Sequence, residues 1–246
     1  MKSPLSVTPE KTSGQKRGER VPEPLPEMSC AHCSAANCIK LTKTFPDFCV
    51  TVKADEAVKK RCTQRYLKSS KDRKIALAAA DIAGNYYGIT TRVEEILLFV
   101  KKMGYERVGV ASCVALLGAC NQFARIAHAK GVHVYGVACK VGAVDKNEIG
   151  AGKRQEPEPG AHESMCNPIL QAELLNEAQT DFNIIMGLCV GHDTLFIEHS
   201  RAPVTYLIVK DRVLCNNPAA ALYETSGFYK RLLTPDLPAP NGTNSR

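Results

Sequence analysis

The order of apolar and helical segments predicts an α/β fold, with an open, mainly parallel sheet and helices on both faces. The first observation is a strand–helix–strand unit, in which the segments Val108–Ala111, Val114–Lys130 and Val132–Ala138 follow one another. Such a unit places its strands parallel, through a right-handed crossover. The second observation is that two further short apolar segments, 182–188 and 204–209, alternate with helical ones. The third is a chain of 246 residues, 44% hydrophobic and 23% charged, which is long enough to bury a core.

The remaining elements follow from the same kinds of pattern. Pro168 stands in the first turn of a predicted helix at 168–180. A short helix is predicted at Asp193–His199, and Arg212–Cys215 is a candidate edge strand. Three helices are predicted before the sheet, at 55–68, 72–87 and 91–102. The last of them begins at a Thr cap and ends before Gly104.

These elements divide the chain into four predicted parts. Residues 1–27 are a Pro-rich, disordered extension, and residues 28–52 are a small Cys-rich metal module. Residues 53–234 form the α/β domain, with a helical lead-in at 53–103 and the sheet at 107–215. Residues 235–246 repeat the composition of the extension and are a loose tail. The polar stretch 147–165 is a candidate lid if the protein is an enzyme.

Eleven cysteines are the unusual feature of the composition. Residues 1–27 contain no apolar segment of the kind found in secretory signal peptides, and the cysteine count is odd. The longest uncharged stretch, Val108–Ala124, is short and interrupted by polar residues, which argues against a membrane span. We therefore expect a cytoplasmic protein without a membrane segment, whose thiols are reduced and serve as packing residues, metal ligands or reactive groups.

The positive charge is concentrated in one segment. Residues 40–74 hold eleven bases and four acids, a net charge of +7, whereas residues 75–246 hold sixteen bases and seventeen acids. One interpretation is a nucleic-acid-binding module through the basic 28–74 region. We prefer a solvated helix face, because few aromatic residues are present to stack on bases.

Cys30, Cys33, Cys38 and Cys49 form a C-x2-C-x4-C-x10-C pattern within twenty residues. The first pair has the spacing with which two thiolates hold one ion from a tight turn, and two more complete a tetrahedral shell. A segment this short cannot build its own core, so a metal would supply folding energy. Zinc and an iron–sulfur cluster both fit four thiolates. His32 is a weaker candidate ligand.

Four other cysteines occupy similar positions in the predicted sheet. Cys113, Cys139 and Cys189 each follow a predicted strand, and Cys166 directly precedes a predicted helix. Ligands bind outside the carboxyl ends of parallel strands, where helix N-termini stabilise thiolates and anions. We therefore predict a cofactor-binding site formed by Cys113, Cys139, Cys166 and Cys189, with small-residue packing as the alternative.

Two chemistries remain open for this predicted site. One is a second metal or iron–sulfur centre. The other is a thiol-dependent enzyme that uses Cys189 with His192 as base and Asp193 as its orienting group, or that uses Cys113. Lys140 is either a cation for a thiolate or small anionic ligand, or a solvated loop residue. No glycine-rich phosphate loop follows the first strand, so a nucleotide site is poorly supported.

Several motifs resemble a family of small cysteine-rich proteins of unknown function, common in anaerobic microbes and usually described as metal-binding. The resemblance covers about residues 28–233, and it implies two Cys-rich regions and metal binding but no reaction. At Cys215 the sequence departs from the pattern, so its role stays undecided, and Cys62 and Cys120 are expected to be packing residues. The motifs are CKVGAVDK at 139–146, CNPILQAELLN at 166–176, GLCVGHD at 187–193, APVT at 202–205 and KDRV at 210–213.

Overall fold

The computed structural model describes residues 27–39, 44–151 and 162–238. The chain forms two compact units, Met1–Arg65 and Tyr66–Arg246, here called unit 1 and unit 2. The predicted extension, most of the predicted lid and the last eight residues lie outside the described part. The finer division of the chain made above stays a prediction.

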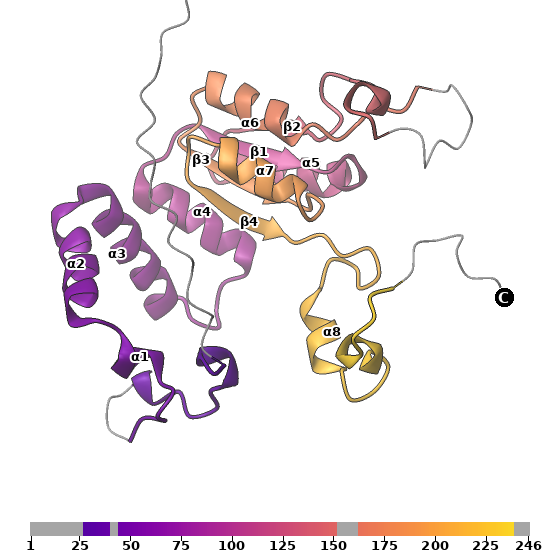
Figure 1. Cartoon of the computed structure of the whole chain (residues 1–246). Helices are drawn as coiled ribbons and strands as arrows, with labels where there is room; N and C mark the ends of the chain where they lie inside the picture. The colour runs from indigo at the N-terminus through magenta and orange to yellow at the C-terminus, as the bar shows by residue number, and fades with distance from the viewer. Residues whose placement is uncertain (1–26, 40–43, 152–161, 239–246) are drawn as a thin grey trace, which may run out of the picture. The chain divides into compact units, whose positions relative to one another are not determined.

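Unit 1 contains only short elements and the first part of one longer helix (Figure 1). The short ones are the 3-10 helices η1 (Cys30–His32) and η2 (Asn37–Ile39) and the helix α1 (Val50–Lys53). Helix α2 (Glu56–Lys68) crosses the boundary between the units. None of these four elements buries a residue. The described part of unit 1 therefore lacks the apolar core that normally holds a fold together.

Unit 2 is built on a four-stranded, entirely parallel sheet, which confirms the predicted fold class. Its strands are β1 (Val108–Ser112), β2 (Val134–Ala138), β3 (Phe182–Met186) and β4 (Val204–Ile208), in the order β2-β1-β3-β4. Both central strands, β1 and β3, are buried along their whole length. This burial explains why their sequences read as continuous apolar runs.

Helices cover both faces of the sheet, as predicted (Figure 1). Along β3, Phe182, Ile184 and Met186 contribute to one core, which includes residues of α4 (Arg92–Met103) and α5 (Leu117–Ala129). Ile185 contributes to a second core, which includes residues of α6 (Pro168–Glu177) and α7 (His192–His199). The alternation follows from the two-residue period of a strand.

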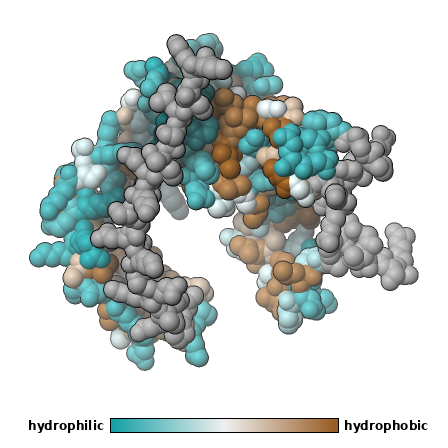
Figure 2. Space-filling model, turned by 45° about the horizontal axis from the view of Figure 1, so that its top comes forward, coloured by the Kyte–Doolittle hydropathy of each residue, from teal (hydrophilic) through white to brown (hydrophobic). Residues whose placement is uncertain are grey.

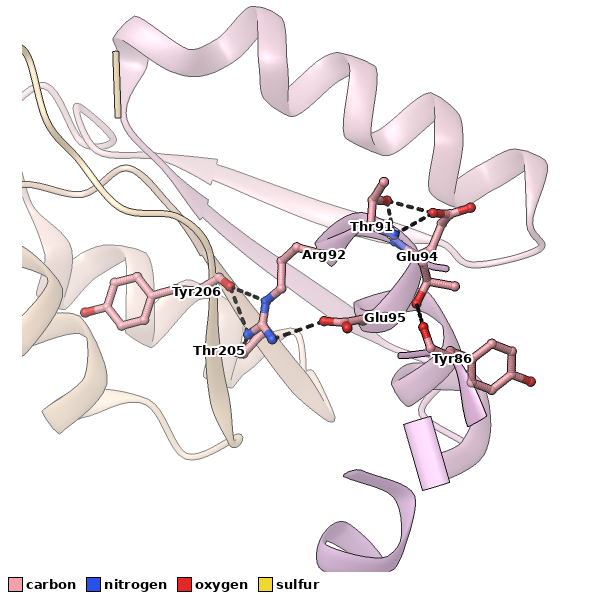
Figure 3. Close-up of polar contacts among 8 residues, drawn as sticks. Tyr86, Thr91, Arg92, Glu94, Glu95, Thr205 and Tyr206 are labelled. Carbon is pink, nitrogen blue, oxygen red and sulfur yellow. Dashed lines mark hydrogen bonds and ion pairs between the residues drawn. The ribbon is translucent and has the colours of Figure 1, made fainter. Parts of the chain in front are cut away.

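Helix α3 (Ser70–Asn85) packs on α4, which is tied to the edge strand β4 (Figure 3). Arg92 donates from Nη2 to Thr205 Oγ1 at 2.7 Å and from Nε to the Tyr206 carbonyl at 3.2 Å. Thr91 and Glu94 form a capping box at the start of α4. The prediction of this helix, including its Thr cap and the Gly104 after its end, is confirmed.

The remaining elements are the 3-10 helices η3 (Val114–Leu116), η4 (Lys146–Ile149) and η6 (Lys230–Leu233) and the helix α8 (Ala219–Tyr223). Hydrophobic residues reach the surface in this C-terminal segment, where Leu222, Tyr223 and Phe228 are all exposed (Figure 2). Among the described residues, no helix is both long and apolar enough to cross a membrane.

The predicted edge strand at Arg212–Cys215 is wrong, because this segment is a turn. The Asp211 carboxylate accepts hydrogen bonds from the N–H groups of Val213 and Leu214, both at 2.8 Å. Cys215 and Asn216 both have positive φ angles, 51° and 64°. An Asx turn followed by two left-handed residues does not extend into a strand.

Candidate functional site

Four of the five cysteines of unit 1 line one small cavity. Cys30, Cys33, Cys38 and Cys49 surround it, together with residues that include Phe45 and Phe48. Its volume is about 30 Å³, and its lining is mostly apolar. The fold of this short segment therefore brings the predicted metal ligands to one place. Across the residues that the structure describes, no three His, Cys, Asp or Glu side chains already form a metal-ligand group.

Local hydrogen bonds distinguish Cys49 and His32 within this module. Burial opposes ionisation of Cys49, but the N–H groups of Val52 and Thr51 and the Thr51 hydroxyl lower its pKa below the ordinary value. A lower pKa favours the thiolate, the form that binds metals. His32 accepts a hydrogen bond at Nδ1 from the Ser29 N–H at 3.2 Å, within the capping box of η1. A histidine binds a metal through one of its two ring nitrogens, and this bond occupies one of them in His32.

In unit 2, Cys113 and Cys139 each stand one residue beyond the end of a paired strand. The last paired residues of β1 and β2 are Ser112 and Ala138. The Cys139 N–H donates to the Ser112 carbonyl at 2.8 Å, which continues the ladder. Gln171 Nε2, on α6, reaches both strands, at 3.2 Å from the Ser112 carbonyl and 2.6 Å from that of Val137. These bonds hold the two cysteines on neighbouring strands, which lie about 4.8 Å apart in a sheet.

Cys166 reaches the same edge of the sheet from the start of α6. The Asn167 N–H donates to the Cys139 carbonyl at 2.7 Å, which ties the start of α6 to the end of β2. The sulfurs of Cys166 and Cys139 are 3.7 Å apart. Three of the four predicted cysteines are therefore brought together, because Cys139 also interacts with Cys113.

Cys189, the fourth cysteine, follows β3 and lies beside a cation that the sequence did not single out. Arg212 donates a hydrogen bond from Nη2 to the Cys189 sulfur at 3.0 Å. The guanidinium also interacts electrostatically with Cys113 and Cys166. We call Cys113, Cys139, Cys166 and Cys189 the sheet-edge thiols.

The pKa values of the two central thiols are shifted in opposite directions. Burial opposes ionisation of Cys113, but the Ala115 N–H, the Lys210 ammonium and the Cys139 thiol together lower its pKa. Burial is the main cause that raises the pKa of Cys139 to about 12. Cys166 and Cys113 also raise it, whereas the hydrogen bond from the Val114 N–H lowers it. Only 2% of Cys139 is exposed, compared with 8% of Cys113. One thiol is therefore prepared to ionise and its neighbour is not.

Lys210 and Arg212 are the functional candidates that sequence reasoning missed. Both lie in the segment directly after β4, at the same edge as the thiols. Among the described residues, neither has a carboxylate at ion-pair distance. Their position after a parallel strand was the available signal, since such ends share one edge.

Gly187, directly after β3, permits this close approach. Its φ of +68° is in the left-handed region. A Cβ atom there would lie 2.2 Å from Leu116 Cδ1 and 3.6 Å from Lys210 Cε. Only glycine lets the segments that carry Cys113 and Lys210 pack over the end of β3.

His192 and Asp193 lie at the start of α7, after Cys189. The Asp193 carboxylate accepts hydrogen bonds from the N–H groups of Gly191 and Thr194 and, at 2.9 Å, from the Tyr206 hydroxyl. Burial and this carboxylate raise the pKa of Tyr206 to about 12. The His192 backbone N–H donates to the Cys189 carbonyl at 2.9 Å, but among the described residues no hydrogen bond joins the His192 ring to Cys189 or Asp193. The predicted roles of both residues remain untested.

Of the two roles weighed for Lys140, neither is seen. Its ammonium donates to the Ser164 carbonyl and thereby holds the strand-to-helix connection.

Cys120 is buried in the α4 and α5 core, as expected. Cys62 is exposed on α2, so its prediction as a packing residue is wrong. Cys215 is exposed in the turn after Asp211.

The basic helix α2 presents most of its cations to solvent. Lys60, Arg61 and Lys68 are exposed, and Lys59 pairs with Glu56 at 2.6 Å. Tyr66 is its exposed aromatic residue. A solvated helix face and a nucleic-acid surface would both show such exposure, so our preference for the first stays a prediction.

Comparison with known proteins gives a family and a relative. The model of a family described as "Protein of unknown function (DUF1847)" matches residues 49–207, which include all four sheet-edge thiols but not Cys30, Cys33 or Cys38. The chain is 46% identical over 209 residues to "Uncharacterized protein MJ0455" of Methanocaldococcus jannaschii. That alignment covers 84% of this chain and 98% of the relative. With the match extending over most of the chain and the whole of the sheet, this protein belongs to the DUF1847 family.

Proposed function

We propose that this protein binds a metal through Cys30, Cys33, Cys38 and Cys49 of unit 1. We also propose that it presents a second, Cys-lined site at the carboxyl edge of its sheet. The metal is a zinc ion or an iron–sulfur cluster. The observation that carries the proposal is that Cys30, Cys33, Cys38 and Cys49 all line one cavity.

The size and surroundings of this cavity favour a single ion. One water-sized particle needs roughly 10–15 Å³, so the cavity of about 30 Å³ has room for an ion and little more. Phe45 and Phe48 contribute apolar surface to the lining beside the thiols. Four sulfurs around one ion would form the tetrahedral shell that zinc prefers, with bonds of roughly 2.3 Å.

The absence of a core among the described residues of unit 1 supports the same proposal. Its short helices bury no residue, so apolar packing contributes little to their stability. A structural metal contributes roughly 10–16 kcal/mol in comparable small modules. The bound metal would thus supply the stability that packing does not.

Elemental analysis of anaerobically purified protein tests the proposal. We expect close to one equivalent of zinc, or about two or four equivalents of iron with a brown colour if a cluster is bound. Cys33→Ser should lose most of the metal, because it removes one of four ligands. Cys62→Ser is the matched control, because Cys62 is exposed in the same unit but does not line the cavity. Less than about a tenth of an equivalent in the wild type, or equal loss in both variants, would refute the proposal.

The sheet-edge thiols form the second part of the proposal, as a binding site for a cofactor or small anionic ligand. The support is the 3.7 Å separation of the Cys139 and Cys166 sulfurs and the presence of Lys210 and Arg212.

The alternative is that the basic 28–74 region binds nucleic acid. In that case, the nucleic-acid affinity measured by filter binding will fall steeply as salt is raised. No salt-dependent binding at low ionic strength would remove that alternative.

A further inference from the structure

We propose that Cys113 and Cys139 form a thiol–disulfide exchange pair, in which Cys113 attacks an anionic disulfide and Cys139 resolves the mixed disulfide. This inference concerns unit 2 alone. It deepens the second part of the proposed function, and it does not rest on the metal of unit 1.

The two thiols differ in the way that the two roles require. An attacking thiol must ionise near neutral pH and be reached by its substrate, whereas a resolving thiol stays protonated until the first step is complete. Cys113 is the more exposed of the pair and interacts with the Lys210 ammonium. Cys139 lies deeper, with only 2% of its surface exposed, and its sulfur accepts a long hydrogen bond of 3.5 Å from the Val114 N–H.

The backbone fixes the pair side by side. Cys113 and Cys139 follow strands paired in register up to Ser112 and Ala138. Gln171, completely buried, bridges the two strand ends through its amide nitrogen. The thiols therefore do not need a loop movement to find each other, and exchange between them is intramolecular.

The charge at the site selects the substrate class. Lys210 and Arg212 interact with the sheet-edge thiols, and among the described residues neither has a carboxylate at ion-pair distance. Two acidic residues of the flanking segments, Asp193 and Asp211, accept hydrogen bonds from the Tyr206 hydroxyl and from backbone N–H groups, respectively. Two cations beside a buried thiolate attract a disulfide that carries carboxylates and repel one that carries amines.

The chemistry balances in two exchange steps. The Cys113 thiolate attacks one sulfur of the substrate, its S–S bond breaks, and the departing thiolate takes up a proton from solvent. Cys139 then loses its proton and attacks the Cys113 sulfur, which releases the second half of the substrate as a thiol. The substrate disulfide gains two electrons, and the protein dithiol becomes a disulfide. Turnover would require a dithiol reductant as second substrate, which reverses the oxidation by the same exchange.

The test uses the full, anaerobically reduced protein, with oxidised glutathione as the anionic probe and cystamine as the cationic one. Samples are quenched in acid, free thiols are alkylated, and the modified peptides are identified by mass. In the wild type we expect a Cys113–Cys139 disulfide. In Cys139→Ser we expect a glutathione mixed disulfide that accumulates on Cys113.

Two comparisons make the result specific. Cys120 has the same 8% exposure as Cys113, but burial raises its pKa, so it should react at least about tenfold more slowly. Oxidised glutathione should react about tenfold faster than cystamine at low salt, and Lys210→Met should reduce that preference.

Three outcomes would overturn the inference. The first is a wild-type disulfide between Cys139 and Cys166 that forms without modification of Cys113. The second is a mixed disulfide on Cys166 or Cys189 while Cys113 stays free. The third is an equal rate of reaction with oxidised glutathione for Cys113 and Cys120. The wild-type time course needs no variant, so it decides the question even if a substitution prevents folding. Because the products are read in unit 2 peptides, loss of the unit 1 metal does not mimic a negative result.

Discussion

The cysteines of unit 1 and the sheet-edge thiols are held in place by opposite means. Cys30, Cys33 and Cys38 are exposed, in elements that bury no residue, and their common feature is one small cavity. Cys113 and Cys139 are buried at the ends of paired strands. The first set needs a ligand to stabilise its arrangement, whereas the second is arranged by the sheet before any ligand binds.

Under the proposed function, this difference explains why the same residue type would serve two purposes. Thiols without a surrounding core are free to move toward a metal, and the metal then supplies the folding energy. Thiols in a rigid, buried frame keep individual environments, so their pKa values diverge. The following predictions test each side of this contrast, from the largest expected effect to the smallest.

Removal of the metal should affect unit 1 and spare unit 2. We expect a chelator to abolish amide-exchange protection in peptides that cover η1, η2 and α1, because a structural metal contributes roughly 10–16 kcal/mol. Peptides of β1 and β3 should keep their protection, because these strands are buried in the sheet. Hydrogen-exchange mass spectrometry measures both. Equal loss of protection in β1 would contradict the contrast between the units.

Truncation of the core beneath the sheet-edge thiols should weaken unit 2. Leu175 is completely buried in the same core as Cys113 and Cys139. Leu175→Ala should lower the free energy of unfolding by about 2–5 kcal/mol, through lost burial and the cavity left behind. Urea denaturation followed by circular dichroism measures this.

Val190→Ala is the control for Leu175→Ala, because Val190 is 93% exposed. It should change the free energy of unfolding by less than about 0.5 kcal/mol. Equal effects of the two substitutions would show that the core does not position these thiols.

The pH dependence of alkylation should separate the two central thiols. The pKa of Cys113 is lowered from 9.0, so its reaction with iodoacetamide should reach half its maximal rate below pH 9. That of Cys139 is raised to about 12, so it should react slowly throughout the neutral range. Peptide masses after timed labelling measure both rates, and a common midpoint would refute the assignment of distinct roles.

The same shifts have opposite consequences for stability. Cys113 is ionised in the folded state and protonated in the unfolded state between its lowered pKa and 9.0, so in that window its contribution rises with pH. Cys139 has the opposite effect between about pH 9 and about pH 12, because there its thiol ionises only in the unfolded chain. In that window its contribution to stability falls as pH rises. Urea unfolding at a series of pH values measures the sum.

The smallest effect is expected at α4, a helix that carries no cysteine. Arg92→Met removes the hydrogen bonds from α4 to Thr205 and to the Tyr206 carbonyl, and should destabilise unit 2 by about 1 kcal/mol, because the side chain is largely exposed. The alkylation rate of Cys113 should not change. Glu95→Gln is the control, since its contact with Arg92 is 3.8 Å long and exposed. A changed rate in Arg92→Met would show that the thiols depend on the whole domain.

Much of the fold was predictable because its signals are local. The apolar runs of β1 and β3, the Thr91 cap and the Gly104 stop each depend on a few neighbouring residues. The edge strand predicted at Arg212–Cys215 was wrong. The signal for the turn that replaces it is also local, but it is weaker in the sequence than the signals above. Asp211 forms an Asx turn there, and the two following left-handed residues are not glycines.

The candidate site was predictable only in outline. The rule that parallel strands end at one edge selects Cys113, Cys139 and Cys189, and the cysteine spacing at 30–49 selects the ligands of unit 1. The sequence alone thus determined the fold class and the two sets of cysteines, since both follow from periodicity and spacing along the chain. Only the tertiary structure decided that Cys139 lies between Cys113 and Cys166, and that Lys210 and Arg212 lie beside the thiols. These contacts join segments far apart in the chain, so they depend on burial and through-space charge, which no local pattern records.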